Sequence, residues 1–448
     1  MRSHPGLPRS ARAWTVAALI AAATVVLSSG VTPWVDAAGG AFVPPDIAQD
    51  VAAARLFADR VNPYGPVIRE MHSRVVPVPV NETFPYFPHP PFSLAVSWLF
   101  AFVTFQTAAL LWFSFSVALL FLLAALLAEN LANDGGTPPA RPGTRSIMAL
   151  FLLLLAWPPV LYNLEKGQWS ILLTVLVALG WRALSSGRQR EGGGWIGLAA
   201  SVKVFPVLLG GYLLLRARPA LIWFVMTGLV ATGFPLLFIG WDAFPAFVRQ
   251  SQLNLPYWET FPSVTYSVHG ALARLMIGGQ WARPAVHAPA LARSLELLAT
   301  LSLLWVAARV TLRANKAHMP DAQTAMPFAA WAVLLPILNP QSLGHNGVLL
   351  ALPLVLTARG VFRDDRTWVK AAWTAGLVLV SIPRQTLWRL APVPIDPIEG
   401  IGVIALPMWG ALLLLSVAVS LSTEEIRALA GRERSPGSGK MGRLPTKV

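Results

Sequence analysis

The sequence predicts an all-α protein, a polytopic bundle of about twelve transmembrane helices, on three observations. Hydrophobic residues occupy 55% of its 448 positions, charged residues only 12%, and the mean hydropathy is +0.57. Several apolar stretches reach the roughly 18 residues that cross a hydrocarbon core as a helix. Basic residues gather in short loops and near the C-terminus, which is the pattern of cytoplasmic loops.

Composition also excludes several functions. The formal net charge of +14 is explained by basic cytoplasmic loops, so we expect membrane lipids and no nucleic acid as partners. Cysteine is absent, which rules out disulfides, thiolate metal sites and cysteine nucleophiles. No P-loop, H-E-x-x-H, G-x-S-x-G or Rossmann glycine motif occurs. We therefore expect no nucleotide hydrolysis, no cofactor and no required metal.

The first apolar stretch, residues 14–31, follows a basic N-terminal segment. We interpret it as an uncleaved first span with a cytoplasmic N-terminus; a cleaved signal peptide is the alternative. Further spans are predicted at 91–104, 106–129, 146–162, 169–186, 195–215, 219–240, 290–311, 325–339, 345–358, 368–382 and 401–421. Residues 1–430 then form a single integral membrane domain, and 431–448 a disordered, basic cytoplasmic tail.

Twelve spans place both chain ends in the cytoplasm and the loops 32–90, 241–289 and 383–400 outside. The short loop 163–168 then faces the cytoplasm. Arg182, Arg188 and Arg190 fall outside in this arrangement, against the positive-inside pattern. The alternative is that 91–104 and 106–129 together make only one full crossing, which shifts the parity locally.

The first outer segment carries a pair of carboxylates. Residues 47–60 are predicted to form an amphipathic helix at the membrane interface, ending at Asn62-Pro63-Tyr64-Gly65. Asp46 and Asp50 are four residues apart, so they share one helix face. Carboxylates also stabilise a helix N-terminus, which is the structural alternative for both.

Ionisable and amide side chains also occur within or beside the predicted spans. Lys203 lies about eight residues, or about 12 Å, from the outer end of its span, where an ammonium can hold a phosphate or instead snorkel. His345, in Asn-Pro-Gln-Ser-Leu-Gly-His, can donate to a phosphate or a sugar hydroxyl, or belong to a helix-capping loop. His89, His269 and Arg384 lie in outer segments, as substrate-binding groups or as interface residues.

Four motifs in chain order resemble glycosyltransferase family 87. They are Asp46 with an Ala-rich helix and Pro63-Tyr64; Gly167-Gln168 before a span; Gly197, Leu198, Ala199, Lys203 and Pro206; and Pro340, Ser342 and His345. The resemblance runs from Asp46 to about Ala358. Departures from the family pattern occur at Asp59, Asn339, Leu343 and Asn346, and bear on acceptor recognition more than on reaction class.

The resemblance implies a GT-C fold with interfacial helices in the first outer loop and an extracytoplasmic active site in the cell membrane. It implies a hexosyltransferase that moves a sugar, with mannose expected, from a polyprenyl-phosphate donor to a glycolipid or glycan acceptor with inversion. Asp46 is the implied general base, and Lys203 and His345 would stabilise the leaving phosphate. Asp50, Tyr64, His89, His269 and Arg384 are further candidates for substrate binding.

Two other functions also fit the sequence. A lipid-linked sugar flippase or transporter would equally use broken helices and a buried lysine, although no inverted repeats are evident. A polysaccharide polymerase or ligase would take a diphosphate-linked oligosaccharide in place of a monophosphate-linked single sugar.

Overall fold

The computed structural model describes residues 44–65, 67–75, 87–132, 142–260, 265–320, 324–391 and 393–433. Within these ranges the regular structure is helical, and the strand-like pairings are isolated bridges between Thr265 and Leu343 and between Ala282 and Ile395. The all-α prediction is confirmed. The predicted first span at 14–31 and the tail beyond Glu433 lie outside the described residues, while residues 431–433 still belong to the last helix.

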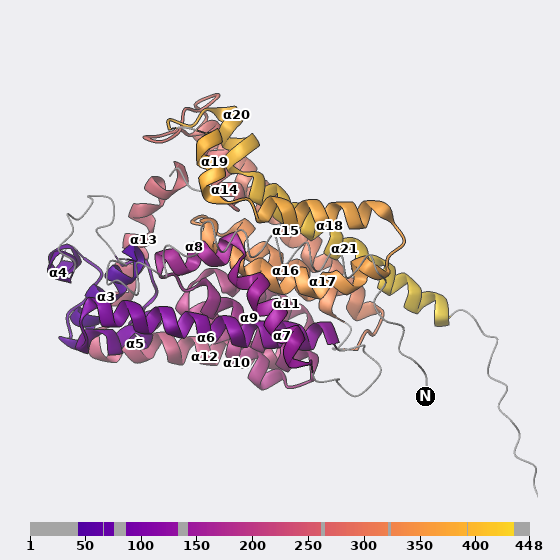
Figure 1. Ribbon diagram of the computed structural model, residues 1–448, viewed down its shortest axis with the longest axis horizontal. Coiled ribbons are helices and arrows are strands. Elements are labelled where there is room, and N and C mark those ends of the chain that lie inside the picture. The colour runs from indigo at the N-terminus through magenta and orange to yellow at the C-terminus, as the bar shows by residue number, and fades with distance from the viewer. Residues whose placement is uncertain are drawn as a thin grey trace, which may run out of the picture.

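Figure 1 shows the helices of this bundle. In chain order they are α3 (Pro45–Ala58), α4 (Val67–Val75), α5 (Pro91–Ser97), η2 (Trp98–Phe102), α6 (Phe105–Ala132), α7 (Thr144–Leu155), α8 (Pro158–Lys166), α9 (Ser170–Ser185), α10 (Gln189–Val202), η3 (Phe205–Leu208), α11 (Leu209–Arg216), α12 (Arg218–Ile239), α13 (Ala243–Thr260), α14 (Val268–Met276), α15 (Pro289–Lys316), α16 (Ala325–Leu338), η5 (Gly344–Leu350), α17 (Ala351–Arg363), α18 (Thr367–Val380), α19 (Arg384–Leu390), α20 (Pro397–Glu399), η6 (Gly400–Ile404) and α21 (Leu406–Glu433).

Five helices of the described residues are long and apolar enough to cross a membrane: α6, α12, α15, the joined η5 and α17, and α21. The pair α7 and α8, bent by 68°, would be a sixth. The other apolar helices, such as α9, α16 and α18, have 10–17 residues and are shorter than a full span. Shortened and broken helices occur where backbone lines a cavity within the protein rather than lipid.

The predicted span 195–215 is not one helix. It breaks at Lys203, whose backbone is extended (φ −141°, ψ 141°) between the end of α10 and the start of η3. Pro206 lies in the first turn of η3, where the absence of a proline N–H disturbs no helical hydrogen bond. Lys203 therefore lies at a helix end rather than within a continuous span.

Successive helices alternate between two ends of the bundle. Helix α9 begins beside Gln168 and ends near Arg182, whose Nε lies 2.9 Å from Glu129 Oε2 near the end of α6. Helix α10 returns to Lys203, and η3 with α11 leads away again to Arg216. Gln168 and Lys203, joined by a hydrogen bond, thus mark one end, which we call the cavity end.

Many of the arginines and lysines lie at the opposite end, which we call the basic end. Phe328, near the start of α16, contacts Trp181 of α9 and Tyr212 of α11 with ring centroids 4.9 and 5.2 Å apart, so these helix ends meet. Arg216 also donates to Asn315 Oδ1, near the end of α15, at 3.0 Å. This basic end carries Arg182, Arg188, Arg190, Arg216, Arg218, Arg313, Lys316, Arg363, Arg366 and Arg427. The arginines that were misplaced in the twelve-span arrangement thus join the others.

The twelve-span arrangement put Arg182, Arg188 and Arg190 on the outer side because it counted the segment 91–104 as a crossing. Helices α5 and η2 contact α3, and Arg55 of α3 donates to the backbone oxygen of Val103 at 3.4 Å. The segment therefore begins and ends beside α3 instead of crossing the bundle, as the alternative interpretation allowed. The prediction that loop 163–168 faces away from Asp46 was wrong, because it counted this segment as a crossing.

Helix α3 also differs from the prediction of an amphipathic interfacial helix. Ile47, Val51 and Ala52 to Ala54 are each 0% exposed, and Ala48 is 1% exposed. Neighbours surround the helix, with α4, α5, η2, α6 and α8 all in contact. A helix buried on nearly all sides belongs to the core, so its small alanine side chains serve close packing.

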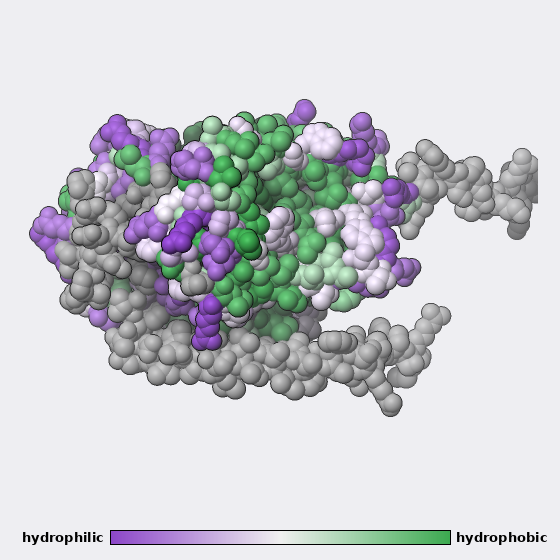
Figure 2. Space-filling view, turned by 90° about the horizontal axis from the view of Figure 1, so that it is seen from above, coloured by the Kyte–Doolittle hydropathy of each residue, from purple (hydrophilic) through white to green (hydrophobic). Residues whose placement is uncertain are grey.

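Figure 2 shows one face of the molecule with a broad hydrophobic band in the middle and hydrophilic residues at both ends. Exposed apolar side chains of α12 and α15 contribute to the apolar surface, among them Leu229, Val230 and Leu298 at 65%, 66% and 62% exposure. A contiguous apolar surface of this kind marks contact with lipid.

Candidate active site

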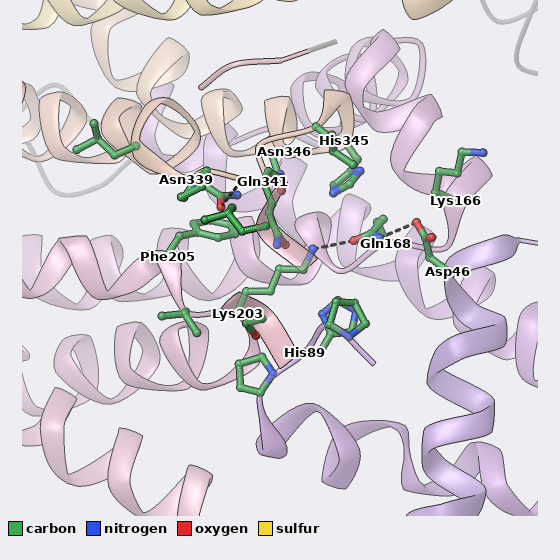
Figure 3. Close-up of a pocket in the computed structure, with 18 of the residues that line it drawn as sticks. Asp46, His89, Lys166, Gln168, Lys203, Phe205, Asn339, Gln341, His345 and Asn346 are labelled. Carbon is green, nitrogen blue, oxygen red and sulfur yellow. Dashed lines mark hydrogen bonds between the residues drawn. The ribbon is translucent and has the colours of Figure 1, made fainter. Parts of the chain in front are cut away.

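A cavity of about 650 Å³ opens at the cavity end of the bundle. Side chains from α3, α8, η3, α13 and α19 and from the segments 88–90 and 338–346 line it (Figure 3). Its ionisable lining residues are Asp46, His89, Lys166, Lys203, His345 and Arg384. Residues separated by more than 300 positions in the sequence thus face one hollow.

Asp46 lies in the first turn of α3 and is half-buried at the cavity wall. Its Oδ2 accepts a hydrogen bond of 2.6 Å from Gln168 Nε2. Burial raises the pKa of Asp46 above its usual value, while the Gln168 hydrogen bond and the charges of Lys166 and Lys203 act in the opposite direction. A carboxylate whose pKa moves toward neutrality is a more effective general base.

Gln168 joins Asp46 to Lys203. Its Oε1 accepts a hydrogen bond of 2.7 Å from Lys203 Nζ, while its Nε2 donates to Asp46 (Figure 3). The side-chain amide is oriented by these two charged partners, with its donor toward the carboxylate and its acceptor toward the ammonium. A carboxylate and an ammonium are thereby held one amide apart at the cavity wall.

The turn between α8 and α9 makes this contact possible. Gly167 ends α8 in the left-handed conformation (φ +70°), and a Cβ there would lie 3.2 Å from side-chain carbons of Ile47 and Pro44. Glycine thus permits both the turn and the close approach of α3. Asn163 fixes the turn, because its Nδ2 donates to Gln168 O and its Oδ1 accepts from Ser170 N, each at 3.0 Å.

Asp50 lies one turn further along α3 and does not line the cavity. Its side chain is fully buried, and its Oδ2 accepts a hydrogen bond of 2.9 Å from Trp169 Nε1. His89 Nε2 lies 3.6 Å from the other carboxyl oxygen. Burial raises the pKa of Asp50 to about 8 and lowers the pKa of His89 well below its usual value. Asp50 and His89 are therefore both neutral at pH 7.

His345 enters the cavity from η5, close to two side-chain amides. Its ring lies 5.9 Å from that of Tyr162, and its Nδ1 is buried without a hydrogen-bond partner among the described residues. Asn346 accepts a 3.2 Å hydrogen bond from Ser170 Oγ, which ties η5 to the start of α9. Figure 3 shows His345, Asn339, Gln341 and Asn346 above Lys203 and Gln168.

Three of the predicted substrate-binding residues do not line the cavity. Asp50 is held by Trp169, and Tyr64 is buried with its hydroxyl donating to the backbone oxygen of His89 at 2.7 Å. His269, on α14, has its Nδ1 2.8 Å from Glu296 Oε1 of α15. Asp46, His89, Lys203, His345 and Arg384 do line it.

Gln168 and Lys166 were not among the predicted site residues. The Gly167-Gln168 pair is one of the four motifs in the sequence, but the twelve-span arrangement predicted a cytoplasmic position for its turn. As for metals, no group of three histidine or acidic side chains in the described parts of the chain is arranged to hold an ion. Asp46, Lys203 and the cavity amides are suited to proton abstraction and to binding an anion.

Apolar helices around a polar cavity define the chain as a membrane protein. The family model of glycosyltransferase family 87 matches residues 87–292, which include His89, Gln168 and Lys203. The match covers a little under half of the chain, and it indicates a glycosyltransferase similar to family 87. The resemblance predicted from the sequence is confirmed. No curated protein matches the chain.

Proposed function

We propose that the protein transfers a sugar, with mannose expected, from a polyprenyl-phosphate donor to a glycolipid or glycan acceptor, with inversion at the anomeric carbon. The observation that carries the proposal is the Asp46–Gln168–Lys203 chain on the wall of one cavity. Inversion requires an attacking oxygen on one side of the sugar and a leaving phosphate on the other. A base and a cation held one amide apart suit that geometry.

Each group has a distinct role in the proposed reaction. Asp46 takes the proton of the acceptor hydroxyl as its oxygen forms a bond to the anomeric carbon. The bond between that carbon and the phosphate oxygen breaks, and its electron pair stays on the phosphate. Lys203 stabilises the charge that develops there, and His345 can donate a hydrogen bond to the same group.

An exposed apolar part of the cavity lining supports a lipid-linked donor. Val204, which directly precedes η3, Val207 of η3 and Val248 of α13 line the cavity and are 53%, 49% and 38% exposed. Exposed apolar side chains beside a polar cavity suit a ligand with a hydrocarbon chain and a charged head. A nucleotide sugar would have no use for this surface.

The basic end indicates how the protein sits in the membrane. Positive residues in short loops favour the cytoplasmic side, and in this structure the ten arginines and lysines named above lie at the end opposite the cavity. We therefore propose a cell-membrane protein whose cavity opens on the extracytoplasmic side.

The test is incubation of the purified protein with radiolabelled polyprenyl-phosphate mannose, and with glucose and galactose analogues, together with a panel of lipid acceptors. Transfer should give a labelled glycolipid of inverted anomeric configuration. Retained configuration would refute the single-displacement mechanism. Transfer from diphosphate-linked oligosaccharides but not from monophosphate donors would contradict the proposed donor and favour a polymerase or ligase.

A further inference from the structure

A second positive centre lies at the cavity, formed by Arg384 at the start of α19 and Lys166 at the end of α8. The guanidinium carbon of Arg384 lies 4.3 Å from the ring centroids of both Tyr162 and Trp388. The rings hold the guanidinium in place by cation–π contact. An anion would therefore meet the N–H edge of a guanidinium whose position is already fixed.

The N–H edge of Arg384 is only weakly engaged. Its Nη2 lies 3.4 Å from Glu165 Oε1, longer than the roughly 2.7–2.9 Å of a strong charged hydrogen bond. Its Nε has no hydrogen-bond partner among the described residues. Lys166 shares the same carboxylate, with its Nζ 3.4 Å from Glu165 Oε1. Two cations thus share one acidic group, so that within the described residues one positive charge of this pair has no acidic partner of its own.

This centre is distinct from the Asp46–Gln168–Lys203 chain. Arg384 makes its contacts with Glu165, Tyr162 and Trp388, whereas Lys203 is bound to Gln168. A monophosphate donor needs a cation next to the departing oxygen, and Lys203 supplies that cation beside the base. The Arg384 centre is then available for a second anion.

We propose that Tyr162, Glu165, Lys166, Arg384 and Trp388 form a subsite for the phosphate of a phospholipid acceptor, and the proposal rests on the proposed function. The planar edge of a guanidinium matches two oxygens of a phosphate, and Lys166 adds a second charge. Anchoring the acceptor by its phosphate would present its hydroxyl groups to Asp46. Acceptors without a phosphate lack this anchor.

The first test measures binding to the purified full-length protein by microscale thermophoresis. The probes are dioctanoyl phosphatidylglycerol and the uncharged dioctanoyl glucosylglycerol, which carry the same acyl chains. We expect wild type to bind the phosphatidylglycerol about tenfold or more tightly, as a hydrogen-bonded charge pair provides. Arg384→Gln should lose most of that preference, and Arg384→Lys should retain part of it. Arg389→Gln is the matched control, because Arg389 is exposed on the same helix and does not line the cavity.

The second test uses inhibition of transfer. Dioctanoyl phosphatidylglycerol should compete with the lipid acceptor and not with the polyprenyl-phosphate donor. Equal binding of the two probes by wild type would overturn the subsite, whether or not the variants fold. So would equal effects of Arg384→Gln and Arg389→Gln, or competition with the donor. The binding arm requires no catalysis, so absence of transfer would count against the proposed function alone.

Discussion

Replacing Gln168 with methionine tests the connection between the base and its surroundings. Methionine has a similar length but removes both the hydrogen bond to Asp46 and the one from Lys203. The first of these lowers the pKa of Asp46 against the raising effect of burial. The pKa of Asp46 should therefore rise further in the variant.

The size of that rise follows from the strength of the lost contact. A hydrogen bond to a charged group contributes about 1.5–3 kcal/mol, and one pKa unit corresponds to about 1.4 kcal/mol. The expected increase is thus about one to two units. The base acts in its deprotonated form, so the rate climbs as the pH rises through the pKa of Asp46. The acidic limb of the profile should move to higher pH by the same amount.

The measurement is the pH dependence of kcat/KM, which reports ionisations of the free enzyme. Gln252→Met is the control, because Gln252 lines the same cavity on α13 and is exposed, whereas the hydrogen bonds of Asp46 and Lys203 described above go to Gln168. An acidic limb that stays at its wild-type position in Gln168→Met, despite a folded protein, would refute the role given to this amide.

Three further predictions concern packing, the buried carboxyl and orientation. Gly193→Ala should destabilise the fold by about 1–3 kcal/mol, because the new Cβ would lie 1.9 Å from Ala220 O. Gly194→Ala is the control, because its Cβ would make only an ordinary contact. Thermal unfolding compares the two variants, and equal unfolding midpoints would contradict this packing. Asp50 has a folded-state pKa of about 8, far above its unfolded value, so its contribution to stability is lost as the pH rises toward 8. The thermal midpoint of Asp50→Asn relative to wild type should accordingly increase from pH 5 to pH 8, and a constant difference would exclude the raised pKa. Because the chain has no cysteine, Ala285→Cys should react with a membrane-impermeant maleimide on intact cells and Ser186→Cys only after permeabilisation; the reverse result would invert the proposed orientation.

The fold class was predictable from the sequence for physical reasons, and the family resemblance was predictable from its motifs. A mean hydropathy of +0.57 leaves a helical membrane bundle as the simplest way to satisfy backbone hydrogen bonds in lipid. Lys203 was identified as a site residue because an ionisable group within an apolar span is costly to keep. Asp46 and His345 were identified from the motifs that resemble glycosyltransferase family 87. In the structure, all three side chains line the same cavity.

The break at Lys203 and the course of 91–104 were not predictable from hydropathy. Both lie in continuous apolar stretches, where hydropathy alone does not distinguish one crossing from a broken or returning helix. The error on 91–104 then placed Gln168 on the wrong side of the membrane from Asp46. The difference between Asp46 and Asp50 also required tertiary structure, because helical spacing puts both on one face and only Trp169 and His89 separate their environments.

The most direct measurement is the transfer rate of Asp46→Asn under saturating donor and acceptor, with thermal unfolding as a check on folding. Asparagine keeps an oxygen that can accept from Gln168 but cannot take a proton at neutral pH. Our account predicts a loss of about 100-fold to 10,000-fold in kcat, the usual contribution of a positioned general base. A folded Asp46→Asn protein with kcat within a few-fold of wild type would contradict it.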